Sequence, residues 1–195
     1  MKQKILILLF IFIFQTSLKA QNTEEILVGN PNSKVTIKIF SSFTCPHCAN
    51  FHKNIYSKIE QNFVKNEKVK VIFADFPLDI AALNAAKIAR CVSKESSILL
   101  IDELYKEQSN WSKGNTVEQI NANLFIIGNK FKINNEKMQS CLTNKKIEEK
   151  ILNSRIEAQN RYKVNSTPTI VINEKKFEGN ITYENISREI SKLIK

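Results

Sequence analysis

Apolar residues change their spacing along the chain, and each change predicts a different element. Residues 35–40 form a compact β-branched run that predicts a strand, and residues 69–76 predict a second strand that ends at Pro77. Between them, over residues 46–66, apolar side chains recur every four positions and predict one face of a helix. These positions are Phe51, Ile55, Ile59 and Phe63. The order β, α, β predicts parallel strands with a right-handed crossover.

Helical periodicity then continues without a strand pattern from about Asp79 to Arg161. Asp79 is a natural N-cap for the alanine-rich stretch that follows it. The helices predicted in this part of the chain span residues 80–92, 98–105, 116–127, 135–142 and 145–162.

The period changes back near the C-terminus. Residues 168–172 predict a strand, residues 175–177 its hairpin partner, and residues 182–195 an amphipathic closing helix. At the other end, the polar residues 21–34 predict a lead-in without regular structure.

The first twenty residues predict a cleavable secretory signal peptide. A short basic segment precedes Ile5–Phe14, an unbroken run of ten apolar residues, and cleavage is expected after Ala20. Ten helical residues rise only about 15 Å, half the thickness of a bilayer core. An uncleaved membrane anchor stays the alternative, because Leu18 occupies a position where signal peptidase prefers a small residue. Export predicts a location outside the cytoplasm, where cysteines are paired or redox-active.

Composition excludes several classes of protein. With 195 residues, of which 43% are hydrophobic, the chain can bury a core as one domain, or at most as one domain with an insertion. Loss of the predicted signal peptide would lower the net charge from +10 to +7. The lysines are spread along the chain with acids between them, which argues against a nucleic-acid partner.

The segment Cys45-Pro46-His47-Cys48 lies where the first predicted strand gives way to the helix. At a helix N-terminus, unpaired backbone N–H groups and the helix dipole favour an anion, here the thiolate of Cys45. Pro46 suits the first helical turn because its missing N–H would be unpaired anyway, and His47 can add positive charge. The spacing lets Cys48 close a disulfide within one turn. The motif therefore predicts reversible thiol oxidation.

A Cys-x-x-Cys pair can also be half of a zinc site or a purely structural disulfide. Tetrahedral zinc needs two further ligands, usually from a second closely spaced pair. Cys91 and Cys141 lack that spacing, and His47 and His52 are the only histidines. We therefore expect no metal and no other cofactor.

The order of several motifs resembles the bacterial DsbA-like thiol-disulfide oxidoreductases of the thioredoxin superfamily. The resembling segments are Leu27–Pro31, Val35–Ile37, Thr44–His52, Asp75–Leu78 and Ser166–Asn173, with the closing hairpin and helix. The resemblance implies an α/β thioredoxin fold with an inserted helical domain. It places thioredoxin-like parts at residues 21–78 and 145–195 and the insertion at residues 79–144.

The resemblance also implies the activity, the partners and the site residues. It implies a periplasmic enzyme that introduces disulfides into unfolded exported proteins and is re-oxidised by a quinone-linked membrane protein. Cys45 would be the nucleophile and Cys48 the buried resolving cysteine, and Pro168 would be cis. The site residues are catalytic Cys45, Pro46, His47 and Cys48, and substrate-binding Thr167 and Pro168.

Three residues depart from the pattern of these relatives. Ile39 stands where many of them place a buried acid, so that either Asp75 on the neighbouring strand substitutes for it or proton transfer differs. Thr167 stands where the most strongly oxidising relatives carry valine, which leaves the balance between oxidase and isomerase open. Asn173-Glu174 replaces the usual Asn-Gly and disfavours a type I′ turn.

Two other functions are compatible with the sequence. The first is a disulfide isomerase or reductase of the same fold, although residues 21–34 are too short for the N-terminal dimerisation domain of dimeric isomerases. The second is a redox-inactive module that binds peptides or metal. The intact cysteine motif and Pro168 argue against inactivity.

Cys91 and Cys141 lie on apolar faces of two predicted helices of the insertion. They could be two buried free thiols, a common fate for cysteine. In an exported chain we expect a structural disulfide between them, as some relatives have.

Overall fold

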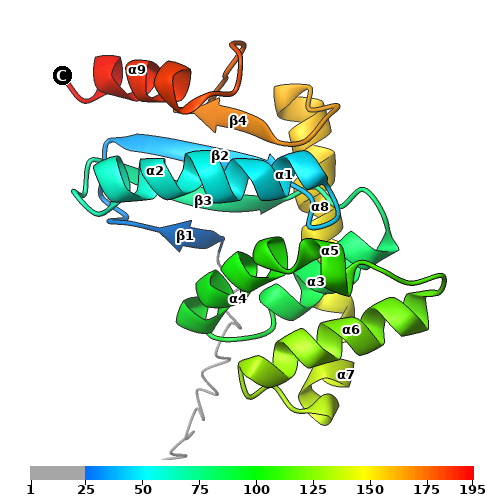
Figure 1. Cartoon of the computed structure of the whole chain (residues 1–195). Helices are drawn as coiled ribbons and strands as arrows, with labels where there is room; N and C mark the ends of the chain where they lie inside the picture. The colour runs from blue at the N-terminus through cyan, green and yellow to red at the C-terminus, as the bar shows by residue number, and fades with distance from the viewer. Residues whose placement is uncertain (1–24) are drawn as a thin grey trace, which may run out of the picture.

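The computed structural model describes residues 25–195 as a mixed sheet flanked by helices, with a helical lobe at one end (Figure 1). The strands are β1 (Ile26–Val28), β2 (Val35–Ser41), β3 (Val69–Asp75), β4 (Thr169–Ile172) and β5 (Lys175–Lys176). Their order across the sheet is β1-β3-β2-β4-β5. Only β2 and β3 are parallel among the paired strands described, as the predicted β-α-β unit requires. The predicted signal peptide, residues 1–20, lies outside the described residues.

Alternation along the central strands creates two apolar faces. On β2, Ile37 and Ile39 point into the larger core, together with Ile186 and Ile190 of α9 (Tyr183–Leu193). Phe40 points the other way. It packs with Ala158 and Tyr162 of α8 (Lys145–Tyr162) in a separate cluster. The sheet is therefore covered on both sides.

The helix after β2 contains two π-helical segments. It runs as α1 (Pro46–Phe51), η1 (His52–Tyr56), α2 (Ser57–Ile59) and η2 (Glu60–Val64). On an ideal α-helix, a strict four-residue repeat turns by about 40° per repeat away from its starting face. The wider π-helical turns offset that drift. Phe51, Ile59 and Phe63 are accordingly all buried, and Ile55 packs against the same core.

The helical lobe lies between β3 and α8. It comprises α3 (Ile80–Ala89), α4 (Lys94–Lys106), α5 (Gln108–Trp111), α6 (Val117–Lys130) and α7 (Asn135–Thr143). Asp79 caps α3 as predicted, since its carboxylate accepts a hydrogen bond from the N–H of Ala82 (2.7 Å). The expected thioredoxin fold with an inserted helical domain is confirmed. No helix in residues 25–195 combines the length and the apolar character needed to span a membrane.

Strand β1 contradicts the expected lead-in. Residues 21–34 were expected to lack regular structure, but Ile26–Val28 pair antiparallel with β3, with Ile26 opposite Phe73. Three residues are too few for a recognisable alternation. The strand exists because β3 offers it an edge and the core buries Ile26.

The turn between β4 and β5 also differs from expectation. Asn173 and Glu174 both have positive φ (44° and 67°), the condition that a type I′ turn requires and that their side chains were expected to disfavour. Tertiary contacts hold the turn. The Asn173 side chain accepts from the N–H of Thr36 (2.8 Å), and the Glu174 carboxylate binds Arg161 (2.7 Å) and the hydroxyl of Tyr162.

Candidate active site

Cys45 is the N-cap of α1, with Pro46 in the first turn, as the sequence predicts. Its carbonyl accepts hydrogen bonds from the N–H groups of Cys48 (3.0 Å) and Ala49 (3.2 Å). Its side chain is not used as a helix cap. The sulfur therefore lies at the positive end of the helix and is left for chemistry.

The two sulfurs of the motif have different environments. Both cysteines are free thiols in the structure, and both are buried, Cys48 almost completely. Burial raises the pKa of the Cys48 thiol from 9.0 to about 12, although the backbone of Ser42 and the side chain of Thr167 partly oppose the rise. Cys48 is therefore protonated at neutral pH in the dithiol state. Pro46 and His47, between the cysteines, are exposed.

The raised pKa of Cys48 predicts that the dithiol form loses stability in alkali. Unfolded Cys48 ionises near pH 9, whereas folded Cys48 stays protonated until about pH 12. The contribution of Cys48 to the free energy of unfolding is therefore complete below pH 9 and is lost between these two pH values. Near pH 10.5 the loss should be about 2 kcal/mol. Urea unfolding of the dithiol protein and of Cys48→Ala, each at pH 8 and 10.5, measures it.

Cys48→Ala serves as the control because Tyr56 and Tyr105, whose pKa values burial also raises, titrate in both proteins. The wild type should lose more stability than the variant between the two pH values. Equal losses would contradict the environment assigned to Cys48.

The loop before β4 faces the cysteines. The Thr167–Pro168 peptide bond is cis, as the resemblance implies. The Cys45 thiol donates a hydrogen bond to the carbonyl of Thr167 (3.4 Å). The nucleophile predicted from the sequence and the two residues expected to bind substrate are thus brought together from positions more than 120 apart in the chain.

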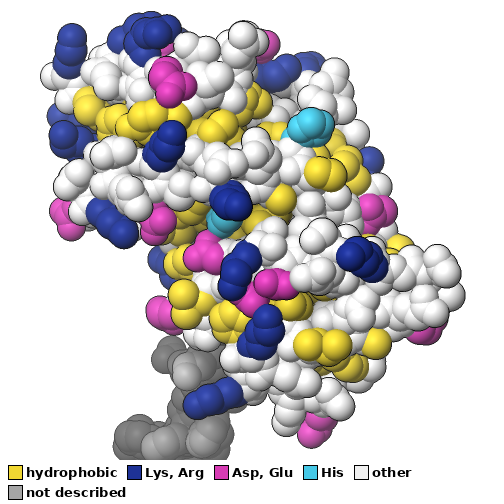
Figure 2. Space-filling model, in the orientation of Figure 1, with side chains coloured by type: hydrophobic (Ala, Val, Ile, Leu, Met, Phe, Trp, Pro, Cys, Tyr) yellow, Lys and Arg dark blue, Asp and Glu magenta, His cyan; other side chains and the backbone are white. Residues whose placement is uncertain are grey.

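An open groove of about 400 Å³ begins beside this contact. His47, Thr167 and Pro168 line it, and Phe51, Ile55 and Ile181 add apolar surface. Figure 2 shows hydrophobic side chains gathered in a band between α9 and the long helix that begins with α1. The nucleophile therefore lies next to a surface that suits an extended, partly apolar chain.

Residues of the helical lobe and of its start hold the segment that leads into Cys45 by hydrogen bonds; those from Gln108 are called the Gln108 clamp. The buried side-chain amide of Gln108, on α5, donates to the carbonyls of Phe43 (2.7 Å) and Cys45 (3.0 Å). Thr44 donates to the Asp79 carboxylate (2.7 Å). The sequence gives no signal for Gln108, since the segment around it has no clear periodicity and its partners are backbone atoms 63 and 65 residues away.

Loss of the Gln108 clamp should impair both stability and redox behaviour. In Gln108→Leu the Phe43 carbonyl loses its donor inside the protein, which should cost about 2 kcal/mol of unfolding free energy. The released Cys45 loop should also shift the equilibrium of the cysteine pair with glutathione. Gln139→Leu, at an exposed site on α7, is the matched control and should change neither value. Identical results for the two variants would contradict the clamp.

Asp75, the candidate substitute for the buried acid that many relatives carry at the position of Ile39, lies at the end of β3. It is buried, and its carboxylate is bound by the Nε of Arg90, which also donates through its other nitrogen to the carbonyl of Phe73 (3.0 Å). Burial raises the pKa of Asp75 while Arg90 opposes the rise. Proton transfer through Asp75 stays a prediction, since the described contact of its carboxylate is with Arg90.

His52 packs against aromatic side chains and contacts an acid of the helical lobe. It is buried, and its ring stacks on Tyr56 and packs at a tilt against Tyr105 (centroid distances 4.9 and 4.8 Å). Its Nε2 lies 2.7 Å from a carboxylate oxygen of Asp102 on α4. The residue therefore joins the long helix to the helical lobe.

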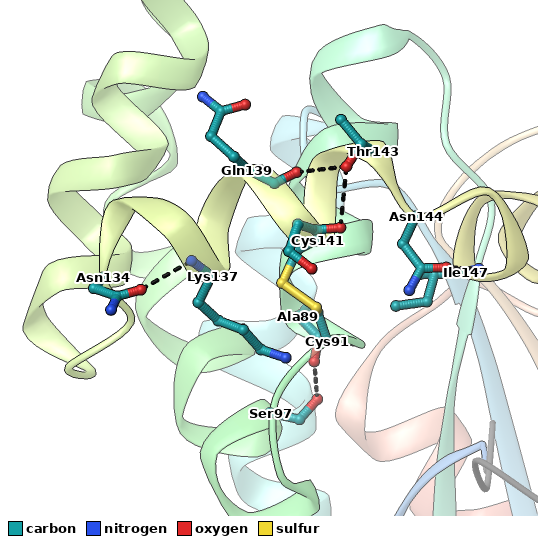
Figure 3. The surroundings of a disulfide bond; sticks show 11 residues. Ala89, Cys91, Ser97, Asn134, Lys137, Gln139, Cys141, Thr143, Asn144 and Ile147 are labelled. Atoms are coloured by element: carbon teal, nitrogen blue, oxygen red, sulfur yellow. Dashed lines mark hydrogen bonds between the residues drawn. A yellow bond between two sulfur atoms is a disulfide. The ribbon is translucent and has the colours of Figure 1, made fainter.

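Cys91 and Cys141 form a disulfide within the lobe (Figure 3). It links the turn after α3 to α7 across 50 residues of chain. Within residues 25–195, no group of three or more His, Cys, Asp or Glu side chains is arranged to hold a metal ion.

Sheet, insertion and dithiol together define a class of protein, the DsbA-like thiol-disulfide oxidoreductases. Comparison with known proteins adds the family. The chain belongs to the thioredoxin family, whose pattern it matches over residues 21–192.

Relatives and solved structures agree with this class. A Rickettsia bellii protein named "Putative protein-disulfide oxidoreductase" is 28% identical over 182 residues, which cover 93% of this chain and 68% of that protein. The crystal structure of Wolbachia pipientis α-DsbA1 superposes with a TM-score of 0.80 at 25% identity, covering 88% of this chain and 91% of that one. Oxidised BdbD from Bacillus subtilis shares the fold (TM-score 0.75, 21% identity, 87% and 92% covered). The chain spans 60% to 68% of the length of five rickettsial relatives.

Proposed function

We propose that the protein is a periplasmic dithiol oxidase that introduces disulfides into exported proteins through Cys45 and Cys48. The observation that carries the proposal is the difference between the two sulfurs. Cys45 begins a helix beside an open groove and the Thr167 carbonyl, whereas Cys48 is buried and has a raised pKa. One sulfur is placed to meet a substrate, and the other to resolve the complex.

The exchange begins with the Cys45–Cys48 disulfide form. A substrate thiolate attacks the sulfur of Cys45, the bond to Cys48 breaks, and the Cys48 sulfur leaves and takes up a proton. A second substrate thiolate then attacks the substrate sulfur of the mixed disulfide and displaces Cys45. Where the mixed disulfide is slow to resolve, the Cys48 thiolate attacks the Cys45 sulfur instead, which re-forms the Cys45–Cys48 disulfide and releases the substrate thiolate. The substrate loses two electrons and two protons and gains a disulfide, and the protein is released as the dithiol.

The groove supports an unfolded substrate. Thr167 lies beside Cys45, so an extended chain could pair with the Thr167 backbone while its cysteine reaches the nucleophile. Phe51, Ile55 and Ile181 would contact apolar side chains on either side of that cysteine. Little sequence selectivity is needed for such binding, which suits an enzyme that acts on many exported proteins.

Export and re-oxidation complete the proposal. The signal peptide predicted at residues 1–20 would deliver the enzyme to the periplasm, and a quinone-linked membrane protein would accept the two electrons. Mass spectrometry of the protein recovered from the periplasm tests the first point. A mature N-terminus at Gln21 is expected, and an uncleaved N-terminus would favour the membrane anchor.

The direction of the reaction is tested by equilibrating the cysteine pair with glutathione buffers and by refolding reduced and scrambled ribonuclease. We expect the Cys45–Cys48 disulfide to be reduced more readily than glutathione disulfide and the enzyme to oxidise the reduced substrate. A strongly reducing pair would contradict the oxidase. Thr167, in place of valine, leaves the balance between oxidase and isomerase open, so the isomerase is the second candidate, and activity only on scrambled substrate would establish it.

A further inference from the structure

We propose that the junction between the helical lobe and β1 is a binding site for a phosphate-bearing anion with two or more negative charges. A cavity of about 280 Å³ lies there, lined by the start of β1, the end of α3 and the first turns of α4 and α8. It is separate from the dithiol, because α3 begins next to Thr44 and its ten residues rise about 15 Å toward the cavity. The proposed oxidase activity does not depend on it.

Among residues 25–195, the lining carries five cationic side chains and one acid. The cations are Arg90, Lys94, Lys137, Lys146 and Lys150, and the acid is Glu25. Of the other carboxylates nearby, Asp75 offsets the charge of Arg90, Glu148 is paired with Lys87 (2.7 Å) and Lys145 (3.2 Å), and Glu95 interacts electrostatically with Lys94. Glu25 itself lies 3.4 Å from Lys38. Positive charge therefore exceeds negative charge in the cavity.

Three of the lysines reach the cavity from three different helices. Lys94 is on α4, Lys137 on α7 and Lys146 on α8, and all three are exposed. Within residues 25–195 their ammonium groups make no hydrogen bond or ion pair that meets ordinary distance limits. Figure 3 shows the side chain of Lys137 running alongside the Cys91–Cys141 disulfide.

Such an arrangement differs from lysines scattered on a solvated surface. Like charges that converge from separate elements repel one another, and a concave site concentrates their field. A bound anion would relieve that repulsion and meet several donors at once. The disulfide ties α7, and hence the backbone that carries Lys137, to the turn after α3 beside the cavity.

The chemistry of the donors favours phosphate. Lysine binds phosphate as a point charge, and several lysines together suit a group with charged oxygens on all sides. The cavity is larger than one inorganic phosphate needs and fits a diphosphate or the phosphate end of a larger molecule. The ligand could be free in solution or part of an anionic lipid headgroup, which offers the same phosphate chemistry.

Titration calorimetry with pyrophosphate at about 0.15 M salt tests the site, and flotation with phosphatidylglycerol vesicles tests the lipid source. Saturable binding of either probe is expected, and Lys94→Gln/Lys146→Gln should weaken it at least about tenfold. Glu25→Gln should strengthen it because Glu25 is the one acid among the described residues of the lining and would lose its charge. Vesicle binding without pyrophosphate binding assigns the phosphate to a lipid headgroup, and the reverse assigns it to a soluble ligand.

The matched control is Lys113→Gln/Lys175→Gln, which removes two exposed lysines that do not line the cavity. It should leave both affinities unchanged, and thiol-disulfide exchange should be equal in all variants. No saturable binding of either probe would overturn the proposal. Equal weakening in the control pair would also overturn it, because the interaction would then follow net charge alone.

Discussion

Cys45→Ser should reduce dithiol oxidation at least about a thousandfold, to the rate without enzyme. The hydroxyl of serine cannot form the mixed disulfide. Among residues 25–195 the other cysteines are poor substitutes, since Cys48 is 1% exposed against 6% for Cys45, and Cys91 is bonded to Cys141. Oxidation of a reduced substrate peptide, followed by mass spectrometry, measures the loss. A Cys45→Ser protein with full activity would contradict the oxidase and the isomerase alike.

Cys48→Ser gives the matched comparison. It keeps the nucleophile, its helix N-terminus and the hydrogen bond from Cys45 to Thr167, but it removes the resolving sulfur. After reaction with an activated disulfide substrate, this variant should accumulate a mixed disulfide through Cys45 that resolves slowly. Cys45→Ser should accumulate none. Mixed disulfides through Cys48 in Cys45→Ser would reverse the roles assigned to the two cysteines.

Removal of the Cys91–Cys141 disulfide should cost up to about 4 kcal/mol of unfolding free energy. The disulfide closes 50 residues of chain, and in the chain-entropy model a loop of this length restricts the unfolded state by about that amount. Cys91→Ala/Cys141→Ala should therefore unfold at a clearly lower urea concentration than the wild type, with both proteins measured in the Cys45–Cys48 disulfide form.

The same variant tests whether the second disulfide takes part in turnover. We propose that it is structural, so the rate of substrate oxidation at a temperature where the variant is folded should match the wild type. Peptide mapping provides an independent check. If Cys91 could be alkylated in the native oxidised protein, or if the urea midpoint were unchanged, the structural role would be contradicted.

Elements with strong local signals were predicted well. The range predicted for α8, residues 145–162, is the range observed, and β2 and β3 lie within one or two residues of expectation. These segments combine clear periodicity with N-caps or β-branched runs, so local sequence alone suffices. The cysteine motif was recognisable for the same reason, because its chemistry depends on residues adjacent in the chain.

Features that depend on distant partners were missed. Strand β1 needs the edge of β3, and the Asn173–Glu174 turn needs Thr36, Arg161 and Tyr162. Gln108 acts on backbone carbonyls, which every residue possesses, so no sequence pattern could indicate it. The cis bond before Pro168 entered only through resemblance to relatives, since few X-Pro bonds in folded proteins are cis.

The helical lobe cannot be cut away to leave a minimal enzyme. A shortened chain joining residue 78 directly to residue 145 would keep every strand, the cysteine motif and Pro168. It would nevertheless lose the hydrogen bonds from Gln108 to the carbonyls that lead into α1 and the contact between Asp102 and His52. It would also lose the packing of α3 against α8. Attempts to miniaturise or transplant this redox centre therefore need the lobe, or a designed replacement for its three contacts.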